Sequence, residues 1–198
     1  MGKFYAVKRG KNPGIYNTWD RCSKEVIGYS GAIYKSFSTM EDAKKFLKEE
    51  DEFLATKNLS DDKAIAYVDG SYDAKKGEFS YGAVIFYKSK EYHFNKKFED
   101  VELSKMRNVA GEIEGAKKAM SFCLKNKILE VDIYYDYKGI ESWAKGEWEA
   151  TKKGTIAYKD YYNKVKDKIK VNFIKVKAHS NNKYNDIADS LAKEALRN

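Results

Sequence analysis

The chain has 198 residues, which is enough for one large domain or for two smaller ones, and its 42% hydrophobic and 15% aromatic residues exclude a disordered tail. No run approaches the ~18 apolar residues of a membrane span, and the charged N-terminal segment lacks the apolar core of a signal peptide. We therefore expect a soluble cytoplasmic protein. Cys22 and Cys123 form no CxxC pair, so we expect free, partly buried thiols rather than a disulfide or a zinc site.

The net charge of +8, from 38 basic and 30 acidic residues, favours a polyanionic partner, nucleic acid above all. A lysine-rich, solvated surface would give the same balance, so the distribution of the charge matters more than its sum. Between Lys3 and Lys35 there are seven basic residues and two acidic ones, interleaved with aromatic residues. Basic and aromatic side chains on one small unit are typical of proteins that bind a nucleic-acid backbone and stack on sugars or bases.

The first fifty residues predict a small α+β unit with the element order ββαβα. Pro13 marks a turn between two short strands, and Thr39 with Asp42 has the spacing of a helix N-cap with its capping box. The expected elements are strands at 3–8 and 14–18, a helix at 18–29, a strand at 32–37 and a helix at 39–51. Residues 51–62 lose clear periodicity, so the expected division is a domain at 1–50, a linker at 51–62 and a second domain at 63–198.

The second domain predicts an α/β fold, a mixed five-stranded sheet flanked by helices. Three successive strands with tight connections indicate an antiparallel meander, and helices then alternate with strands. The expected strands are 64–70, 79–88, 91–99, 131–136 and 171–177. The expected helices are 108–127, segments of 138–169 broken near Gly146 and Gly154, and 182–198.

Asp69 and Asp136 each close an apolar strand, so we expect both carboxylates at the C-terminal ends of strands. In α/β sheets, ligands bind in the crevice outside the carboxyl ends of parallel strands. Two acids at adjacent strand ends would repel each other unless a cation lay between them. The two aspartates are therefore either metal ligands or far apart.

Helical geometry separates two further acids from their solvated neighbours. Glu112 shares a helix side with Ala116 and faces the sheet, whereas Glu114 lies roughly opposite, beside lysines. On the last helix, Asp189 faces inward and Asp186 faces solvent. For any one of these acids a capping or ion-paired carboxylate is the simpler interpretation, but four in this arrangement favour a common cation.

Carboxylate ligands without cysteine suit Mg²⁺ or Mn²⁺ rather than Zn²⁺. Two such ions ~3.5–4 Å apart would clamp the attacking and leaving oxygens of a phosphodiester displacement. His179 lies in a polar segment before Asp189 and is suited to proton transfer or product release, although a lone histidine is more often structural. His93, inside a strand, is interpreted as structural.

Four motifs give residues 62–197 a resemblance to type 1 ribonuclease H. They are YVDGSY with Asp69, NVAGEIEGA with Glu112, YYDYKGIESWAKGEW with Asp136, and VKAHSNNKYNDIADSLAKEA with His179 and Asp189. The N-terminal half resembles the hybrid-binding, viroplasmin-like domain that precedes many such enzymes. The resemblance implies a ribonuclease-H-like sheet and an endonuclease that cuts the RNA strand of RNA–DNA hybrids, leaves 3′-hydroxyl and 5′-phosphate ends, and clears primers and R-loops.

The resemblance also implies roles for individual residues. The four acids would hold two Mg²⁺ ions, with Mn²⁺ as an alternative, and His179 would aid product departure. Asn108 matches an asparagine that contacts the substrate in the minor groove, and Asn185 matches a polar or acidic position near the metals. The implied partner is an RNA–DNA hybrid, whose 2′-hydroxyls distinguish it from DNA duplex, and the protein is expected to be a monomer.

In the N-terminal half, Tyr5, Trp19 and Tyr34 resemble the aromatic residues that pack on the sugars of the DNA strand. Lys35 resembles a phosphate-contacting lysine. Ser36 stands where a second basic residue is common, which should weaken binding modestly. For Tyr5 a role in the strand core is the alternative.

The chain departs from the resemblance in two places. Tyr137 follows Asp136 where several members have a small polar residue, which leaves the contacts on that side open. The segment from Asp136 to His179 is shorter than in members with a basic handle helix, so the handle is either missing or reduced. Ten lysines against four acids between Trp143 and Ala178 still predict a basic surface.

Two other functions compete with this interpretation. One is another enzyme with the same fold, such as a transposase, integrase or resolvase, against which the histidine and the hybrid-binding pattern argue. The other is a hybrid-binding protein with an inert nuclease half. An intact set of inward acids argues against the second, because unneutralised buried carboxylates are costly to keep.

Overall fold

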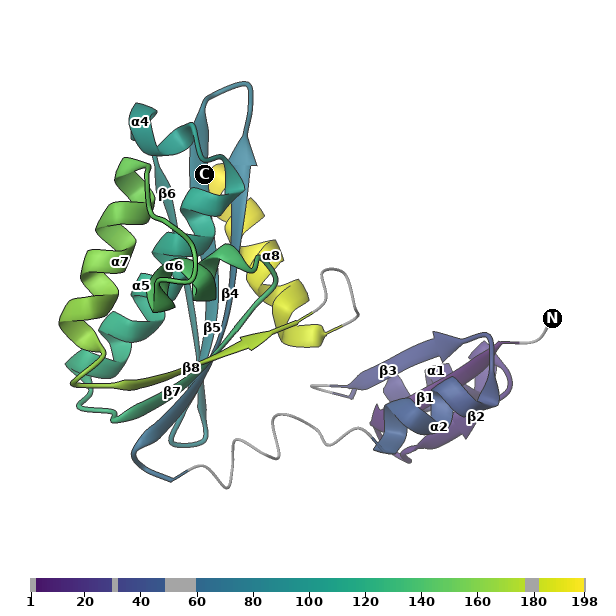
Figure 1. Ribbon diagram of the computed structural model, residues 1–198. Coiled ribbons are helices and arrows are strands. Elements are labelled where there is room, and N and C mark those ends of the chain that lie inside the picture. The colour runs from purple at the N-terminus through teal and green to yellow at the C-terminus, as the bar shows by residue number, and fades with distance from the viewer. Residues whose placement is uncertain (1–2, 30–31, 49–59, 177–181, 198) are drawn as a thin grey trace. The chain divides into compact units, whose positions relative to one another are not determined.

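The structure is a computed structural model that describes residues 3–29, 32–48, 60–176 and 182–197 (Figure 1). The chain divides into two compact units, Met1–Ala55 and Thr56–Asn198, and each is described by itself. The division falls inside the segment 51–62 that the sequence predicts as a linker.

The first unit is a three-stranded antiparallel sheet with two helices. Its elements are β1 (Phe4–Arg9), β2 (Gly14–Tyr16), α1 (Trp19–Val26), β3 (Ile33–Phe37) and α2 (Met40–Lys48). The sheet order is β2-β1-β3, so the predicted ββαβα unit is confirmed. Thr39 and Asp42 cap α2 as expected, since the Asp42 N–H donates to Thr39 Oγ1 at 3.1 Å and the hydroxyl donates back to Asp42 Oδ2 at 2.7 Å.

The two helices of this unit pack on opposite faces of the sheet. Val7 forms a buried cluster with Cys22 and Val26 of α1. The next residue of β1, Lys8, points to the other face, where its Nζ lies 5.2 Å from the centroid of Phe46 on α2. Both cysteines of the chain are free, as expected, but they are fully rather than partly buried.

The second unit is built on a mixed five-stranded sheet flanked by helices, as the sequence predicts. Its strands are β4 (Lys63–Asp73), β5 (Glu78–Tyr87), β6 (Lys90–Phe98), β7 (Glu130–Tyr135) and β8 (Lys170–Lys175). Its helices are α4 (Val101–Ser104), α5 (Asn108–Lys125), α6 (Gly139–Lys145), α7 (Lys153–Val165) and α8 (Lys183–Arg197). The sheet order is β6-β5-β4-β7-β8, with β4, β5 and β6 antiparallel and β4, β7 and β8 parallel.

Helices cover both faces of this sheet (Figure 1). On one face, the ring of Tyr184 in α8 lies 5.4 Å from that of Tyr67 in β4. On the other face, α5 lies so close to the sheet that a Cβ added at Gly115 would be 3.1 Å from the Cβ of Val68. Because Tyr67 and Val68 are consecutive in β4, the two helices sandwich the same strand. No helix in the described parts of the chain is long and apolar enough to cross a membrane.

Three glycines let these helices touch the sheet backbone. A Cβ at Gly82 of β5 would lie 1.9 Å from the carbonyl oxygen of Ala188 in α8. On the opposite face, a Cβ at Gly70 would lie 2.1 Å from the carbonyl oxygen of Asn108, and one at Gly111 would lie 1.9 Å from that of Ser80. Only glycine permits backbone contact at such distances, so these positions fix how deeply α5 and α8 sit on the sheet.

Some element boundaries differ from the prediction. β4 does not end at Asp69 but continues to Asp73, paired with β5 as far as Glu78. The short helix α4 was not predicted, because four residues are too few to show a helical period. Gly146 ends α6 in the left-handed conformation with φ 77°, as expected, whereas Gly154 lies in the first turn of α7 and does not break a helix.

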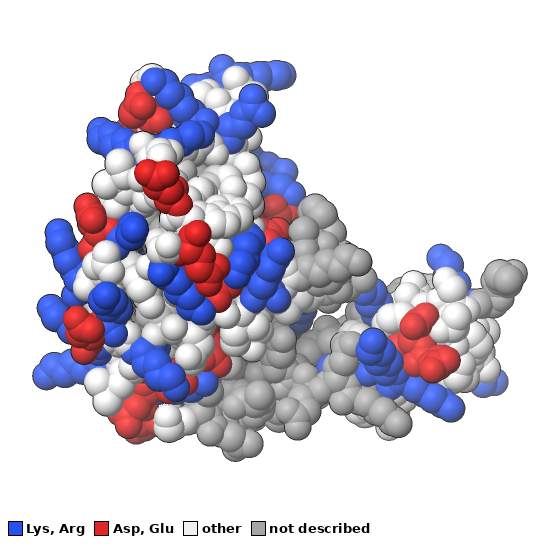
Figure 2. All heavy atoms as spheres, in the orientation of Figure 1, with Lys and Arg blue, Asp and Glu red and all other residues white. Residues whose placement is uncertain are grey.

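The segment between Asp136 and β8 carries two helices, α6 and α7, and the described residues 137–176 contain no additional handle helix. Basic side chains are instead spread over the face shown in Figure 2, with acidic side chains between them.

Candidate active site

Asp69 lies on β4, and Asp136 directly follows the end of the neighbouring parallel strand β7. The last parallel pair of β4 and β7 is Tyr67 with Tyr134, whose rings stack with centroids 4.5 Å apart. Each aspartate comes two residues after its tyrosine, so the two occupy equivalent positions. The prediction that Asp69 stands at a strand end is wrong for β4 as a whole, but the parallel pairing does end just before it.

Glu112 reaches this point from α5. Its side chain is 2% exposed, whereas Glu114 is half-buried and pairs with Lys117 at 2.7 Å, so the predicted contrast between the two glutamates is confirmed. The contact between Gly70 and the backbone of α5 brings Glu112 down beside the residue that follows Asp69. Asn108, one turn earlier, places its Nδ2 3.5 Å from Glu112 Oε1.

Asp189 reaches the same region from α8, on the opposite face of the sheet. It is partly exposed, and its Oδ2 accepts a hydrogen bond from Lys193 Nζ at 2.6 Å. Asn185, one turn earlier on the same side, is 6% exposed and its Oδ1 has no hydrogen-bond partner. Asp186 is exposed, as the helical spacing predicts.

The four carboxylates interact electrostatically. Burial, the Asp136 carboxylate and the Asp189 carboxylate raise the pKa of Asp69 to about 7, although the Gly70 N–H at 2.7 Å opposes the shift. Burial and the charges of Asp136 and Asp69 raise the pKa of Glu112 to about 9, against a hydrogen bond from the Tyr137 N–H. The sequence left open whether the two aspartates meet or lie apart. The parallel pairing of β4 with β7 leaves them at equivalent positions, near enough for the Asp136 charge to raise the pKa of Asp69.

The residues present fit a divalent cation. Glu112 Oε2 is buried without a hydrogen-bond partner, which is costly for a carboxylate unless another group satisfies it. A cation shared by four carboxylates would satisfy that oxygen and remove the repulsion that raises the two pKa values. In the part of the chain that the structure describes, no three acidic, histidine or cysteine side chains already converge closely enough to hold an ion, so binding would draw the carboxylates together.

This electrostatic arrangement predicts how stability depends on pH. Raised pKa values mean that the folded protein binds more protons than the unfolded chain, so the free energy of unfolding should fall as pH rises. Without divalent cations we expect that fall to begin near pH 4, to end near pH 7 for Asp69 and to continue to about pH 9 for Glu112. Urea unfolding in EDTA from pH 5 to 9 measures it.

A Glu112→Gln variant isolates the larger contribution. It should be more stable than the wild type in EDTA at pH 9, and the difference should shrink toward pH 5. A difference that is independent of pH would contradict the assigned cause.

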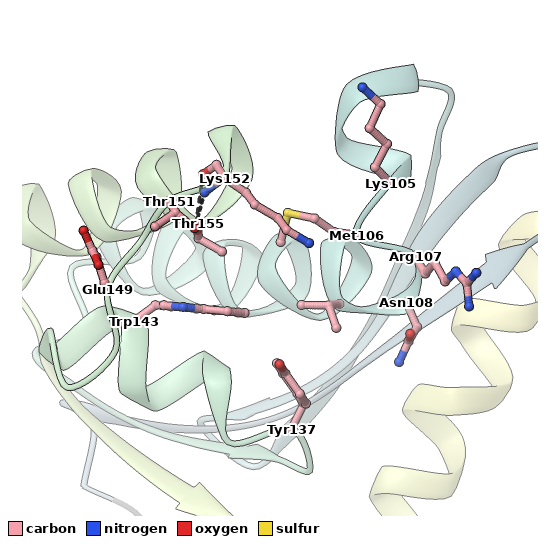
Figure 3. Close-up of a pocket in the computed structure, with 11 residues that line it drawn as sticks. Lys105, Met106, Arg107, Asn108, Tyr137, Trp143, Glu149, Thr151, Lys152 and Thr155 are labelled. Carbon is pink, nitrogen blue, oxygen red and sulfur yellow. Dashed lines mark hydrogen bonds between the residues drawn. The ribbon is translucent and has the colours of Figure 1, made fainter.

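A hollow of about 340 Å³ adjoins the carboxylates (Figure 3). It begins at Asn108 and Tyr137, the neighbours of Glu112 and Asp136, and lies between the start of α5, α6 and the start of α7. Its charged lining residues are Lys105, Arg107, Lys152 and Glu149, and its aromatic ones are Tyr137 and Trp143. A basic and aromatic groove beside a carboxylate cluster suits a polyanionic strand.

The first unit presents the three aromatic residues that the sequence singled out as one cluster. The ring of Trp19 lies 5.8 Å from that of Tyr5 and 5.7 Å from that of Tyr34. Trp19 is 43% exposed and Tyr34 is 45% exposed. Large aromatic rings gathered at the surface are available for stacking on a ligand.

Lys35 does not join this cluster. It pairs with Ala6 across the sheet, on the face opposite to Tyr34, and its Nζ lies 5.6 Å from the ring centroid of Phe37. Ser36, by contrast, is exposed on the aromatic side, opposite Tyr5. A predicted phosphate contact by Lys35 would thus come from the edge of the sheet. His179, the remaining predicted residue, lies outside the described residues.

Sequence reasoning missed two kinds of contributor to the site. The glycines that set the depth of α5 and α8 gave no signal, because their contacts come from distant segments. The hydrogen bond from the Tyr137 N–H to Glu112 was also missed, because a backbone N–H leaves no signal in the sequence.

Comparison with known proteins identifies the family. A model described as the Ribonuclease H1 N-terminal domain matches residues 3–47, and the RNase H model matches residues 61–197. A ribonuclease H of Clostridium botulinum is 30% identical over 149 residues, which cover 68% of this chain and 95% of that protein. The ribonuclease H of Saccharomyces cerevisiae is 59% identical over 47 residues, and the chain spans only 14% of its length.

Among solved structures, LC11-RNase H1 in complex with an RNA/DNA hybrid is similar in fold, with a TM-score of 0.53 and 16% identity over 67% of this chain and 99% of that one. A mixed sheet with clustered carboxylates at its centre defines a ribonuclease-H-like fold. The chain belongs to the ribonuclease H family of enzymes. The interpretation as a transposase, integrase or resolvase is therefore set aside.

Proposed function

We propose that the protein is an endonuclease that hydrolyses the RNA strand of RNA–DNA hybrids and leaves 3′-hydroxyl and 5′-phosphate ends. The observation that carries the proposal is the electrostatic coupling of Asp69 to Glu112, Asp136 and Asp189, beside a basic and aromatic hollow. Family membership supports it, as does the RNA/DNA hybrid in the complex of LC11-RNase H1. Removal of primers and of R-loops would follow from such an activity.

The four carboxylates are the residues that would hold Mg²⁺, as two ions, with Mn²⁺ as the alternative. Bound there, the ions would supply an activated water and stabilise the charge on the leaving oxygen. The protein's own contribution is to bring four like charges near one another, from β4, the end of β7 and two helices, and to bury the Glu112 carboxylate among them. The hollow lined by Trp143, Arg107 and Lys152 would hold one strand of the substrate next to them.

The test is cleavage of one end-labelled RNA, presented as a single strand, as an RNA duplex and as an RNA–DNA hybrid, with Mg²⁺ or with EDTA. The proposal predicts metal-dependent cutting of the hybrid alone, with 3′-hydroxyl products. Tight binding of the hybrid without cutting, under both Mg²⁺ and Mn²⁺, would make the chain a binding protein and overturn the proposal.

The aromatic cluster of the first unit predicts a separate effect on binding. Trp19→Ala removes the ring that lies between Tyr5 and Tyr34, and loss of one stacking ring lowers affinity roughly tenfold. We expect weaker hybrid binding and lower processivity, with the turnover number at saturating hybrid unchanged. Fluorescence anisotropy and multiple-turnover kinetics measure the two effects.

Ile27→Ala is the matched control, because Ile27 is also an exposed apolar residue of the α1 region, at 65% exposure, but is outside the aromatic cluster. It should leave affinity unchanged. Complete loss of cutting by Trp19→Ala at saturating hybrid would contradict the assignment of this cluster to binding alone.

A further inference from the structure

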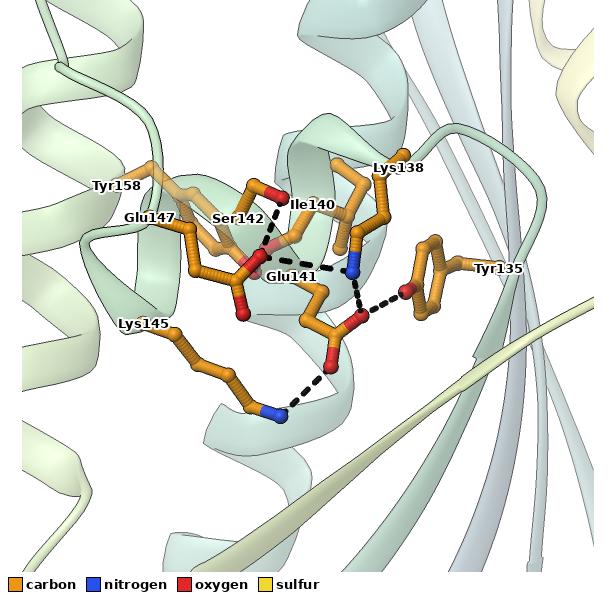
Figure 4. Close-up of polar contacts among 8 residues, drawn as sticks. All are labelled: Tyr135, Lys138, Ile140, Glu141, Ser142, Lys145, Glu147 and Tyr158. Carbon is orange, nitrogen blue, oxygen red and sulfur yellow. Dashed lines mark hydrogen bonds and ion pairs between the residues drawn. The ribbon is translucent and has the colours of Figure 1, made fainter.

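A network of polar side chains holds the turn between β7 and α6, which is the turn that carries Asp136 (Figure 4). Tyr135, the last residue of β7, is fully buried, and its hydroxyl donates to Glu141 Oε2 at 2.7 Å. Lys138, the residue before α6, donates to the same oxygen at 2.5 Å. Glu141 therefore binds the residues on both sides of the segment 136–137.

Glu141 is itself firmly held. Its other oxygen, Oε1, accepts from Lys145 Nζ at 2.6 Å, so the carboxylate has three donors. Lys138 also reaches Glu147 at 3.6 Å, and Glu147 accepts from the buried Ser142 at 2.9 Å. The network thus ties the turn to both ends of α6.

The segment that Glu141 fixes contributes two groups to the site. One is the Asp136 carboxylate, whose charge raises the pKa of both Asp69 and Glu112. The other is the Tyr137 N–H, which donates to Glu112. The Tyr137 ring lies 5.8 Å from Trp143, so the same turn also shapes the hollow.

We propose that Glu141 is a positioning residue for this reaction: through Tyr135 and Lys138 it fixes where the Asp136 carboxylate and the Tyr137 N–H lie. The inference rests on the proposed function, in which Asp136 is a metal ligand. Groups that orient metal ligands typically change metal affinity by ~10–100-fold when they are removed. Glu141 should therefore affect cation binding and turnover without touching the cation or the substrate.

The chain offers a closely matched control at the opposite end of the same strand. Glu130, the first residue of β7, also binds two lysines, Lys63 at 3.0 Å and Lys170 at 3.2 Å, and accepts from Asn172 at 2.9 Å. Hydrogen bonds to Lys63 and Lys170 hold its pKa at about 2. Burial would raise the pKa of Glu141, but its hydrogen bonds outweigh it and give the same value of about 2.

The experiment compares Glu141→Ala, Glu141→Gln and Glu130→Ala in the full chain. Mg²⁺ binding is measured by calorimetry without substrate, and kcat and KM are measured on the hybrid. We expect Glu141→Ala to weaken Mg²⁺ binding at least tenfold and to lower kcat at fixed Mg²⁺ with KM for the hybrid unchanged. Glu141→Gln keeps an acceptor for Tyr135, so it should recover most of the Mg²⁺ affinity and most of kcat. Glu130→Ala should change neither the Mg²⁺ affinity nor kcat.

Tyr135→Phe keeps the inference testable if Glu141→Ala does not fold, since it removes one hydroxyl and leaves Glu141 with its lysines. It should weaken Mg²⁺ binding less than Glu141→Ala and more than Glu130→Ala. Mg²⁺ affinity in Glu141→Ala or Tyr135→Phe equal to that of Glu130→Ala would overturn the positioning role.

Asp136→Asn separates this inference from the proposed function. If that variant loses Mg²⁺ binding while the Glu141 and Tyr135 variants keep it, the inference fails and the proposed function stands. If the wild type binds no Mg²⁺, or if Asp136→Asn binds it normally, both fail.

Discussion

Replacing Asp136 by Asn is expected to lower hybrid cleavage by about a thousandfold or more while leaving hybrid binding largely intact. The carboxylate of Asp136 raises the pKa of both Asp69 and Glu112, so it belongs to the cluster. Asp136→Asn removes a metal ligand and, with it, several kcal/mol of the transition-state stabilisation that the metal supplies. A loss of that size lowers the rate by about three powers of ten. Single-turnover cleavage and anisotropy binding, both with Mg²⁺, measure the two quantities.

Asp132→Asn is the control for this substitution. Asp132 lies on β7, the strand that Asp136 directly follows, and pairs with Lys63 at 2.9 Å and with Asn172 at 2.8 Å. The Asp132→Asn variant should cut the hybrid at close to the wild-type rate. Wild-type cutting by Asp136→Asn would remove this aspartate from the site.

Gly82→Ala should destabilise the second unit and impair the site together. The added methyl carbon would lie 1.9 Å from Ala188 O and 2.6 Å from Ala192 N, which are backbone atoms that cannot move without moving α8. Overpacking of this kind typically costs ~1–3 kcal/mol, and for a unit of this size we expect the melting temperature to fall by roughly 5–10 °C. Because α8 carries Asp189 between those two contacts, Mg²⁺ affinity should fall as well. Calorimetry measures the melting temperature and the Mg²⁺ affinity.

Gly154→Ala is the matched glycine in the same unit. Its new methyl carbon would meet Met106 Sδ at 2.8 Å and Leu103 Cδ2 at 3.1 Å, the far ends of flexible side chains. Alanine also favours a helix over glycine by about 1 kcal/mol, so little net change is expected. If Gly82→Ala and Gly154→Ala lowered the melting temperature and the Mg²⁺ affinity equally, backbone contact at Gly82 would not limit the position of α8.

Periodicity in the sequence predicted which way the acids of α5 and α8 face. Glu112 and Asp189 differ from Glu114 and Asp186 by their angle around a helix, and that angle follows from residue number alone. The distance between Asp69 and Asp136 could not be predicted in the same way. It depends on the register of β4 and β7, which comes from packing between segments far apart in the chain.

The depth at which α5 and α8 pack on the sheet could also not be predicted from the sequence. Gly70 and Gly82 have no side chain whose pattern could be read, and their role follows only from the backbone atoms that approach them. The hollow beside the site likewise combines residues from α5, α6 and α7. The role predicted for His179 remains a prediction.

The four acids come from β4, α5, the end of β7 and α8, so the site forms only after α8 has packed on the sheet. During synthesis, Asp69, Glu112 and Asp136 emerge from the ribosome well before Asp189. A nascent chain that still lacks α8 has all five strands of the sheet but an incomplete set of ligands. The order of translation therefore delays completion of the ligand set until the last helix has been made and has packed on the sheet.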